Sequence, residues 1–120
     1  MALSKRDITR IERALVTSLT EACDTAKAEI PGFEWLTHTV NYANFPQSLI
    51  ITWVFDTRAH KDQALATGLD ARMRELTATA LHGADIPSLP LQRCVHFDSE
   101  EACHTQHGGN WRLRLTRAAN

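Results

Sequence analysis

The chain has 120 residues, with 13 lysine and arginine residues against 14 aspartate and glutamate residues, and a formal net charge of −1. This balance excludes a generally basic nucleic-acid coat protein and an acidic disordered tail, although it leaves room for a local basic patch. A chain of this length, with 43% hydrophobic residues, can bury a core without a metal ion or disulfides. We therefore expect a single domain over residues 1–120.

The sequence also indicates a cellular compartment. No stretch approaches the roughly 20 apolar residues that cross a bilayer, and the first residues lack the apolar segment of a signal peptide. The cysteines, Cys23, Cys94 and Cys103, are odd in number and far apart, which favours a reducing compartment over a disulfide framework. These features predict a cytoplasmic protein with no membrane partner.

The first half of the chain predicts a helix and a hairpin. Apolar residues recur at three- and four-residue steps from Ile8 to Ile30, which predicts a helix over residues 4–30 that ends at Pro31-Gly32. Strands are expected at residues 33–42 and 48–55. The second strand is apolar on both faces and should therefore be the central one.

The second half predicts helices on either side of one strand. Residues 58–81 form either one weakened helix or two helices that separate at Thr67-Gly68. A third strand is expected at residues 91–97, and a short helix starts at Ser99 and ends at Gly108-Gly109. Residues 110–117 alternate apolar and basic side chains, which suits a short edge strand or a docked extension.

These elements predict an α+β fold in the order α-β-β-α-β-α. Two long helices would cover one face of a small antiparallel sheet in a two-layer sandwich. The other face would either be open, which favours a homodimer, or be covered by the C-terminal segment with Trp111. With a break at Gly68, the order resembles the type II KH arrangement of ribosome-binding factors, although Thr67-Gly68-Leu69-Asp70 has one glycine where the KH motif has two.

Histidines and cysteines concentrate between residues 94 and 107. Cys94 and His96 would share one face of a strand, and Cys103 and His107 one face of a helix, so that the four side chains could meet. Two thiolates and two imidazoles suit tetrahedral zinc, which makes a zinc-supported domain one interpretation. The other is that the cysteines pack as small apolar residues while the histidines are solvated.

Two short segments are rich in cations. The first lies on the N-terminal helix and is partly neutralised by Asp7 and Glu12; it comprises Lys5, Arg6, Arg10 and Arg13. The second has no acidic residue nearby and comprises Trp111, Arg112, Arg114 and Arg117. Because arginines beside an aromatic ring can bind phosphates and stack on bases, the C-terminal patch is the predicted nucleic-acid contact; its alternatives are a solubilising end or a contact with a partner.

Three stretches resemble segments of small proteobacterial proteins that are labelled Fis-family transcriptional regulators. They read PGFEWLTH at residues 31–38, FPQSL at 45–49 with VFD at 54–56, and FDSEEAC at 97–103 with HGG at 107–109. The resemblance covers most of the chain and implies a regulator that reads DNA with a C-terminal helix-turn-helix. No functional residue is carried over from it.

The sequence contains no phosphate-binding glycine loop, no G-x-S-x-G and no H-E-x-x-H motif, and we therefore expect no catalytic activity. The favoured interpretation is a small binding or regulatory module that acts through protein–protein contacts, either with itself or with another protein. The alternatives are nucleic-acid or ribosome binding through the C-terminal patch, and the zinc-supported domain.

Overall fold

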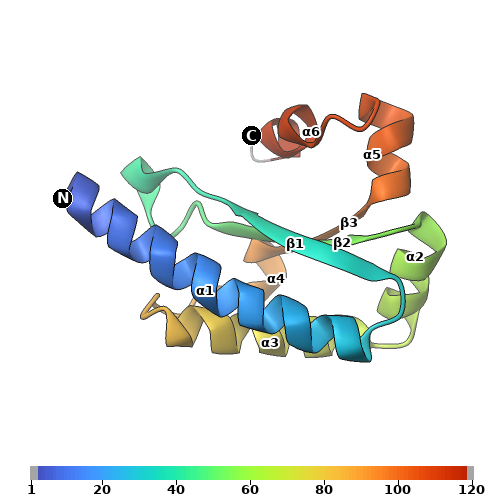
Figure 1. Cartoon of the computed structure of the whole chain (residues 1–120), viewed down its shortest axis with the longest axis horizontal. Coiled ribbons are helices and arrows are strands. Elements are labelled where there is room, and N and C mark those ends of the chain that lie inside the picture. Colours follow the sequence, from blue (N-terminus) through green and yellow to red (C-terminus); the bar gives the residue numbers. More distant parts are fainter. Residues whose placement is uncertain (1–2, 119–120) are drawn as a thin grey trace.

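The computed structural model describes the backbone of residues 3–118 and the side chains of residues 3–116. Helices α1 and α3 lie against one face of a three-stranded sheet, and α5 and α6 lie on the other side (Figure 1). The predicted α+β fold is confirmed. In chain order the elements are α1 (Lys5–Glu29), β1 (Phe33–Thr39), the 3-10 turn η1 (Tyr42–Asn44), β2 (Ile50–Phe55), α2 (Arg58–Ala66), α3 (Leu69–Gly83), α4 (Leu91–Cys94), β3 (Val95–Ser99), α5 (Glu100–His107) and α6 (Trp111–Ala118).

The sheet is mixed rather than antiparallel as predicted. Its order is β1-β2-β3, in which β1 and β2 form the expected antiparallel hairpin and β3 runs parallel to β2. A parallel neighbour requires a long crossover, and α2 and α3 provide it by carrying the chain back to the starting end of β2. The prediction that residues 48–55 contain the central strand is confirmed.

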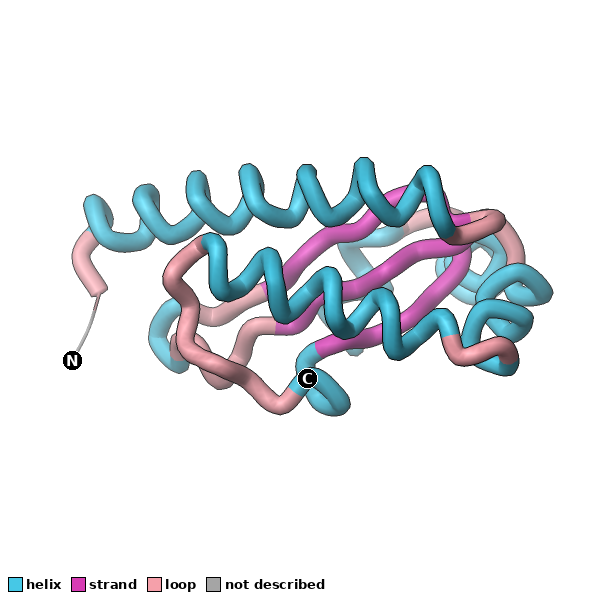
Figure 2. Tube along the Cα trace, turned by 90° about the horizontal axis from the view of Figure 1, so that it is seen from below, coloured by secondary structure: helices cyan, strands magenta, loops and turns pink. Residues whose placement is uncertain are grey.

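The core lies between the sheet and the α1–α3 layer, which spans the three strands (Figure 2). Trp53 on β2 is fully buried, packs 5.0 Å from the ring of Phe33, and donates its indole N–H to the hydroxyl of Thr77 on α3 at 3.1 Å. Each fully buried large apolar side chain stabilises the fold by about 1.5–3 kcal/mol. The central members of the cluster are Leu15, Leu19, Ala26, Ile51, Trp53, Phe55, Met73 and Leu76.

The helical segment after β2 consists of two helices, α2 and α3, which confirms the prediction of a break at Thr67-Gly68. Thr67 closes α2, and Gly68 takes a left-handed backbone with φ of +83° before α3 begins. Glycine adopts this conformation without the steric penalty that a Cβ atom would bring. If η1 and the four-residue helix α4 are left aside, the order up to β3 is helix-strand-strand-helix-helix-strand, on which the resemblance to type II KH domains depends.

Two predicted strands differ in the structure. Residues 91–94 form the short helix α4, because the N–H groups of Arg93 and Cys94 both donate to the carbonyl of Pro90, and the strand runs from Val95 to Ser99 instead. Of the two alternatives for the C-terminal segment, the edge strand is wrong: residues 111–118 form helix α6, which docks on the sheet. Asn110 begins this helix, since its side chain accepts the N–H of Leu113.

Helix α6 covers part of the second sheet face. The rings of Trp35 on β1 and Trp111 on α6 meet edge to face at 5.0 Å, and the carboxylate of Glu100 accepts both indole N–H groups at 2.6 and 3.0 Å. Of the two alternatives for this face, the structure shows the one in which the C-terminal segment and Trp111 fold back onto it. The homodimer stays a prediction. Within residues 3–118, no helix is both long and apolar enough to span a bilayer.

Candidate functional site

A groove follows the N-terminal half of α1. With 25 residues α1 is about 37 Å long, whereas α3 with 15 residues is about 22 Å long. The first turns of α1 therefore extend past the end of α3 (Figures 1 and 2). The groove between them has a volume of about 730 Å³, and its lining residues are Lys5, Arg6, Thr9, Arg10, Arg13, Ala14, Thr17, Ser18 and Gly83.

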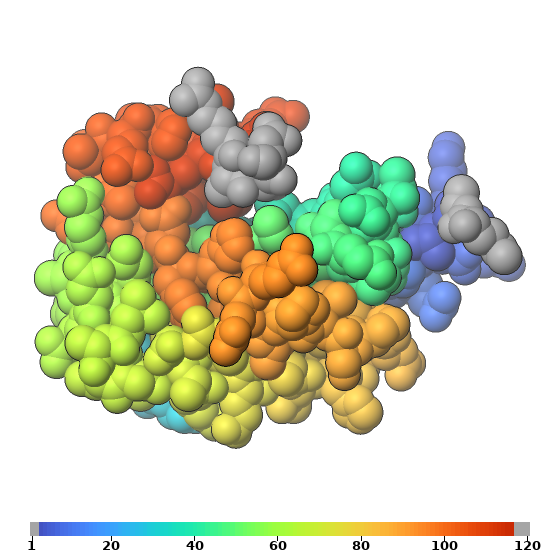
Figure 3. Space-filling view, turned by 180° about the vertical axis from the view of Figure 1, so that it is seen from behind, coloured from blue at the N-terminus to red at the C-terminus, as the bar shows by residue number. Residues whose placement is uncertain are grey.

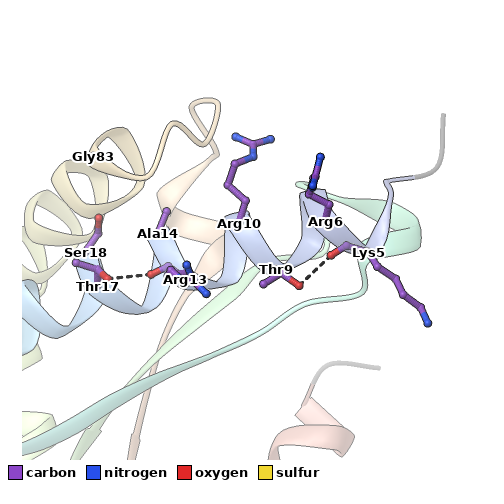
Figure 4. Close-up of a pocket in the computed structure, with 9 residues that line it drawn as sticks. All are labelled: Lys5, Arg6, Thr9, Arg10, Arg13, Ala14, Thr17, Ser18 and Gly83. Atoms are coloured by element: carbon purple, nitrogen blue, oxygen red, sulfur yellow. Dashed lines mark hydrogen bonds between the residues drawn. The ribbon is translucent and has the colours of Figure 1, made fainter.

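The lining of this groove contains four cationic side chains and no carboxylate; we call Lys5, Arg6, Arg10 and Arg13 with the space between them the basic groove. Arg6, Arg10 and Arg13 follow each other at four- and three-residue steps, so they share one side of the helix. Figure 4 shows Arg6 and Arg10 extending to the same side of α1, while Lys5 extends away from them.

The acidic residues that the sequence places beside these cations are used elsewhere. Asp7 forms the capping box of α1, in which its carboxylate accepts the N–H of Ser4 and the Ser4 hydroxyl accepts the N–H of Asp7. The Asp7 carboxylate lies 3.7 Å from the guanidinium of Arg10, and both side chains are largely exposed. Such a pair contributes little, so Arg10 remains available to an anion.

Glu12 is held on the far side of α1 by residues from β1 and η1. Its carboxylate lies 3.0 and 3.2 Å from Nε2 of His38 and accepts the hydroxyl of Tyr42. Partial burial raises the pKa of Glu12, but the hydrogen bonds from Tyr42 and His38 outweigh this and hold the pKa below its usual value. Burial and the neighbouring carboxylate raise the pKa of Tyr42.

Sequence reasoning missed this cluster of Glu12, His38 and Tyr42. Its members are separated by 26 and 30 residues and belong to a helix, a strand and a 3-10 turn. No local pattern joins them, and they meet because α1 packs along the hairpin. The consequence for the basic groove is that the Glu12 carboxylate, although close to its cations in sequence, does not line it.

Two residues of the predicted C-terminal patch, Trp111 and Arg114, make hydrogen bonds within the protein. The guanidinium of Arg114 forms two hydrogen bonds with Asp98, at 2.6 and 2.8 Å, and a third with Gln106 at 2.7 Å. The indole of Trp111 is bound to Glu100. Arg112 is exposed, and the side chain of Arg117 lies outside the described residues. Trp111 and Arg114 are therefore bound within the fold, and Arg112 is the exposed member among the described residues of the patch.

The four predicted zinc ligands do not converge. Cys94 is buried in the core at the end of α4, whereas Cys103 is fully buried on α5. The ring of His96 is 3.1 Å from the Arg93 carbonyl, and His107 lies 3.1 Å from the guanidinium of Arg114. Burial raises the pKa of both thiols. Across the described side chains, no group of three or more Cys, His, Asp and Glu residues is arranged to hold a metal ion.

The last two helices are consecutive, α5 and α6 joined by residues 108–110. Trp111 and Arg114 of the second helix are turned to the sheet and its neighbours, so these side chains are not presented outward as a DNA-reading helix requires. No protein-family model, no curated protein and no solved structure matches this chain. The resemblance to Fis-family regulators accordingly stays a prediction.

Proposed function

We propose that this chain is a non-catalytic binding module that takes the phosphate backbone of a nucleic acid in the basic groove. The observation that carries the proposal is a groove of about 730 Å³ with four cations and no carboxylate in its lining, on a chain whose net charge is −1. A concentration of charge against a neutral total is the electrostatic footprint of a local polyanion contact.

The placement of the cations also supports an anionic ligand. The N-terminus of a helix carries the positive end of the helix dipole and favours negative charge, yet Lys5 and Arg6 occupy the first turn of α1. Arg6 and Arg10 are like charges at a four-residue spacing, which is unfavourable within a helix. A sequence that keeps such locally unfavourable charges is typical of a functional site, and bound phosphates would offset the repulsion.

The choice of side chain favours phosphate over a carboxylate-rich protein. Three of the four cations are arginines, whose planar guanidinium groups donate two parallel hydrogen bonds to a phosphate. Their positions are about 6 and 4.5 Å apart along the axis of α1, so their long side chains can reach neighbouring phosphates of one strand. The hydroxyls of Thr17 and Ser18 line the same groove and can accept or donate.

The proposal places the contact on α1, whereas the sequence favoured the C-terminal patch. A pair of variants that remove the same amount of charge distinguishes binding in the basic groove from binding elsewhere on the protein. One removes three cations of the groove (Arg6→Gln, Arg10→Gln and Arg13→Gln), and the other removes three exposed cations elsewhere (Lys27→Gln, Arg93→Gln and Arg112→Gln). Both triple variants change the net charge equally.

The measurement is fluorescence polarisation of a labelled single-stranded oligonucleotide at low salt. We expect the groove variant to lose at least about tenfold in affinity, the equivalent of about 1.4 kcal/mol, and the control variant to bind within about twofold of the parent. An equal loss in both variants would mean a non-specific charge effect. A larger loss in the control would move the site to its cations, and binding of an acidic peptide but of no oligonucleotide would favour a protein partner.

A further inference from the structure

Helix α6 is held on the second sheet face with little burial of its own side chains. Among its described side chains, those of residues 111–116, none is buried: Trp111, Arg114 and Leu115 are half-buried and the others are exposed. Leu113 is 41% exposed. Burial of an apolar face is the main force that holds a helix on a protein core, so α6 lacks the contribution that holds α1 and α3 in place.

The space beneath α6 is incompletely filled. A pocket of about 570 Å³ lies between α6 and the end of the β1–β2 hairpin, where Asn41, Ser48 and Thr116 are among its lining residues. A second pocket, of about 300 Å³, opens towards β3 and α2, and Leu115 lines both. Protein cores contain few voids larger than a water molecule, so α6 does not pack as a core helix does. Figure 3 shows α5 and the visible part of α6 (orange-red) at the edge of the molecule, on the opposite side from α3 (yellow).

The contacts that hold α6 are polar, and two carboxylates make most of them. Asp98 accepts two hydrogen bonds from the guanidinium of Arg114, at 2.6 and 2.8 Å, and Glu100 accepts the indole N–H of Trp111 at 3.0 Å. The ring of Trp111 also meets that of Trp35 edge to face. Helix α6 supplies the donors, and the sheet and α5 supply the carboxylates. Another segment with the same donors can therefore make the same contacts.

The connection between α5 and α6 is short and lies in open space. At both Gly108 and Gly109 no neighbouring atom lies within 4 Å of the place that a Cβ atom would take. A few such residues at the end of an element are enough for a hinge. Helix α5 is anchored by the buried side chains of Ala102 and Cys103, so α6 can swing away while α5 stays in place.

We propose that α6 is a detachable strap, and that the sheet face it uncovers docks a basic, tryptophan-bearing segment of a partner protein. The present occupant argues for that chemistry, because the carboxylates of Asp98 and Glu100 hold a helix whose sequence contains arginines and a tryptophan and no acidic residue. In this closed state α6 is an internal ligand that a partner segment must displace. The proposal does not depend on nucleic-acid binding, since Asp98, Glu100, Trp111 and Arg114 do not line the basic groove.

The test uses the full chain with α6 released. The released variant, Trp111→Ala with Arg114→Ala, lacks the contacts with Glu100 and Asp98. The matched control, Arg112→Ala with Leu113→Ala, loses one arginine and one large apolar side chain that are both exposed on the same helix. Circular dichroism checks that both variants are folded.

The probe is a labelled synthetic peptide with the sequence of residues 109–118, and its binding is followed by fluorescence polarisation. A segment on a short connection acts at an effective concentration of roughly millimolar, so the released variant should bind the peptide with a Kd below about 1 mM. The parent and the control variant should bind it at least about tenfold more weakly, because their own α6 competes. A second peptide, with alanine in place of the tryptophan and of the arginine that corresponds to Arg114, should not bind. Equal Kd values for the parent and the released variant, or no binding to the released variant, would overturn the proposal.

Hydrogen exchange of the parent protein tests the strap without any substitution. Amides of α6 should exchange through local opening, at least about a hundredfold faster than those of α3, which exchange only when the whole domain unfolds. Equal protection of α6 and α3 would show that α6 does not open by itself, and would overturn the proposal as well.

Discussion

Replacement of Thr77 by valine tests how the α3 layer holds the sheet. Thr77 and Trp53 are both fully buried, and the indole N–H of Trp53 donates to the Thr77 hydroxyl at 3.1 Å. Valine has nearly the same shape but no acceptor, so the indole N–H is left buried and unpaired. Such an orphaned donor costs about 1–3 kcal/mol. For a domain of this size, a loss of about 2 kcal/mol lowers the melting temperature by roughly 6–10 °C.

The assay is urea unfolding, followed by circular dichroism, of Thr77→Val beside the control Thr79→Val, which makes the same change at an exposed position of α3. The control should change the free energy of unfolding by less than about 0.5 kcal/mol. In a Trp53→Phe background, the donor is absent and the cost of Thr77→Val should fall by about 1 kcal/mol or more. Equal costs in the two backgrounds, or equal costs for Thr77→Val and its control, would refute the role of this hydrogen bond.

Two further changes test the turn after α1 and the Glu12 cluster. Gly32 and Gly68 have similar left-handed backbones, with φ of +80° and +83°, but a Cβ at Gly32 would clash with the side chain of His60, whereas no atom lies within 4 Å of a Cβ at Gly68. Gly68→Ala should therefore lower the free energy of unfolding only by the cost of a left-handed residue with a side chain, about 1–2 kcal/mol. Gly32→Ala adds the clash and should be clearly more destabilising in urea unfolding. Because the pKa of Glu12 is lowered on folding, its contribution is present above the unfolded-state pKa of about 4.3 and is lost as the pH falls through the lower folded-state value. The stability difference between the parent and Glu12→Gln should therefore be fully present above the unfolded-state pKa, begin to fall near pH 4.3, and disappear only below the folded-state pKa. A difference that persists unchanged in acid would contradict this. Tyr42→Phe removes one of the hydrogen bonds that lower the pKa of Glu12 and should reduce the pH-dependent part of the difference.

The sequence predicts most elements of the fold because their signals are local. The apolar periodicity of α1, its capping box at Ser4 and the doubly apolar pattern of β2 are each contained in a short window. The parallel placement of β3 is not local, since it depends on how α2 and α3 cross the sheet. The alternating pattern of residues 110–117 suits an edge strand or a docked extension, and the cap at Asn110 and the docking of Trp111 on Trp35 make the segment a docked helix.

The candidate sites are less predictable for the same reason. The cations of the basic groove are visible in the sequence, but the sequence also shows Asp7 and Glu12 beside them. Only the tertiary structure shows that Glu12 is turned to His38 and Tyr42, and that Arg114 of the other patch is bound to Asp98. Charge counted along the chain therefore overestimates the free charge of the C-terminal patch and underestimates that of α1.

The salt dependence of oligonucleotide binding tests the central claim most directly. Contacts from the four cations of the basic groove to a single strand predict a slope of log Kobs against log salt concentration of about −2 to −3. In the Arg6, Arg10 and Arg13 triple variant, one cation remains and the slope should fall to about −0.7. The absence of binding at low salt, or the same slope in the parent and the triple variant, would contradict the account.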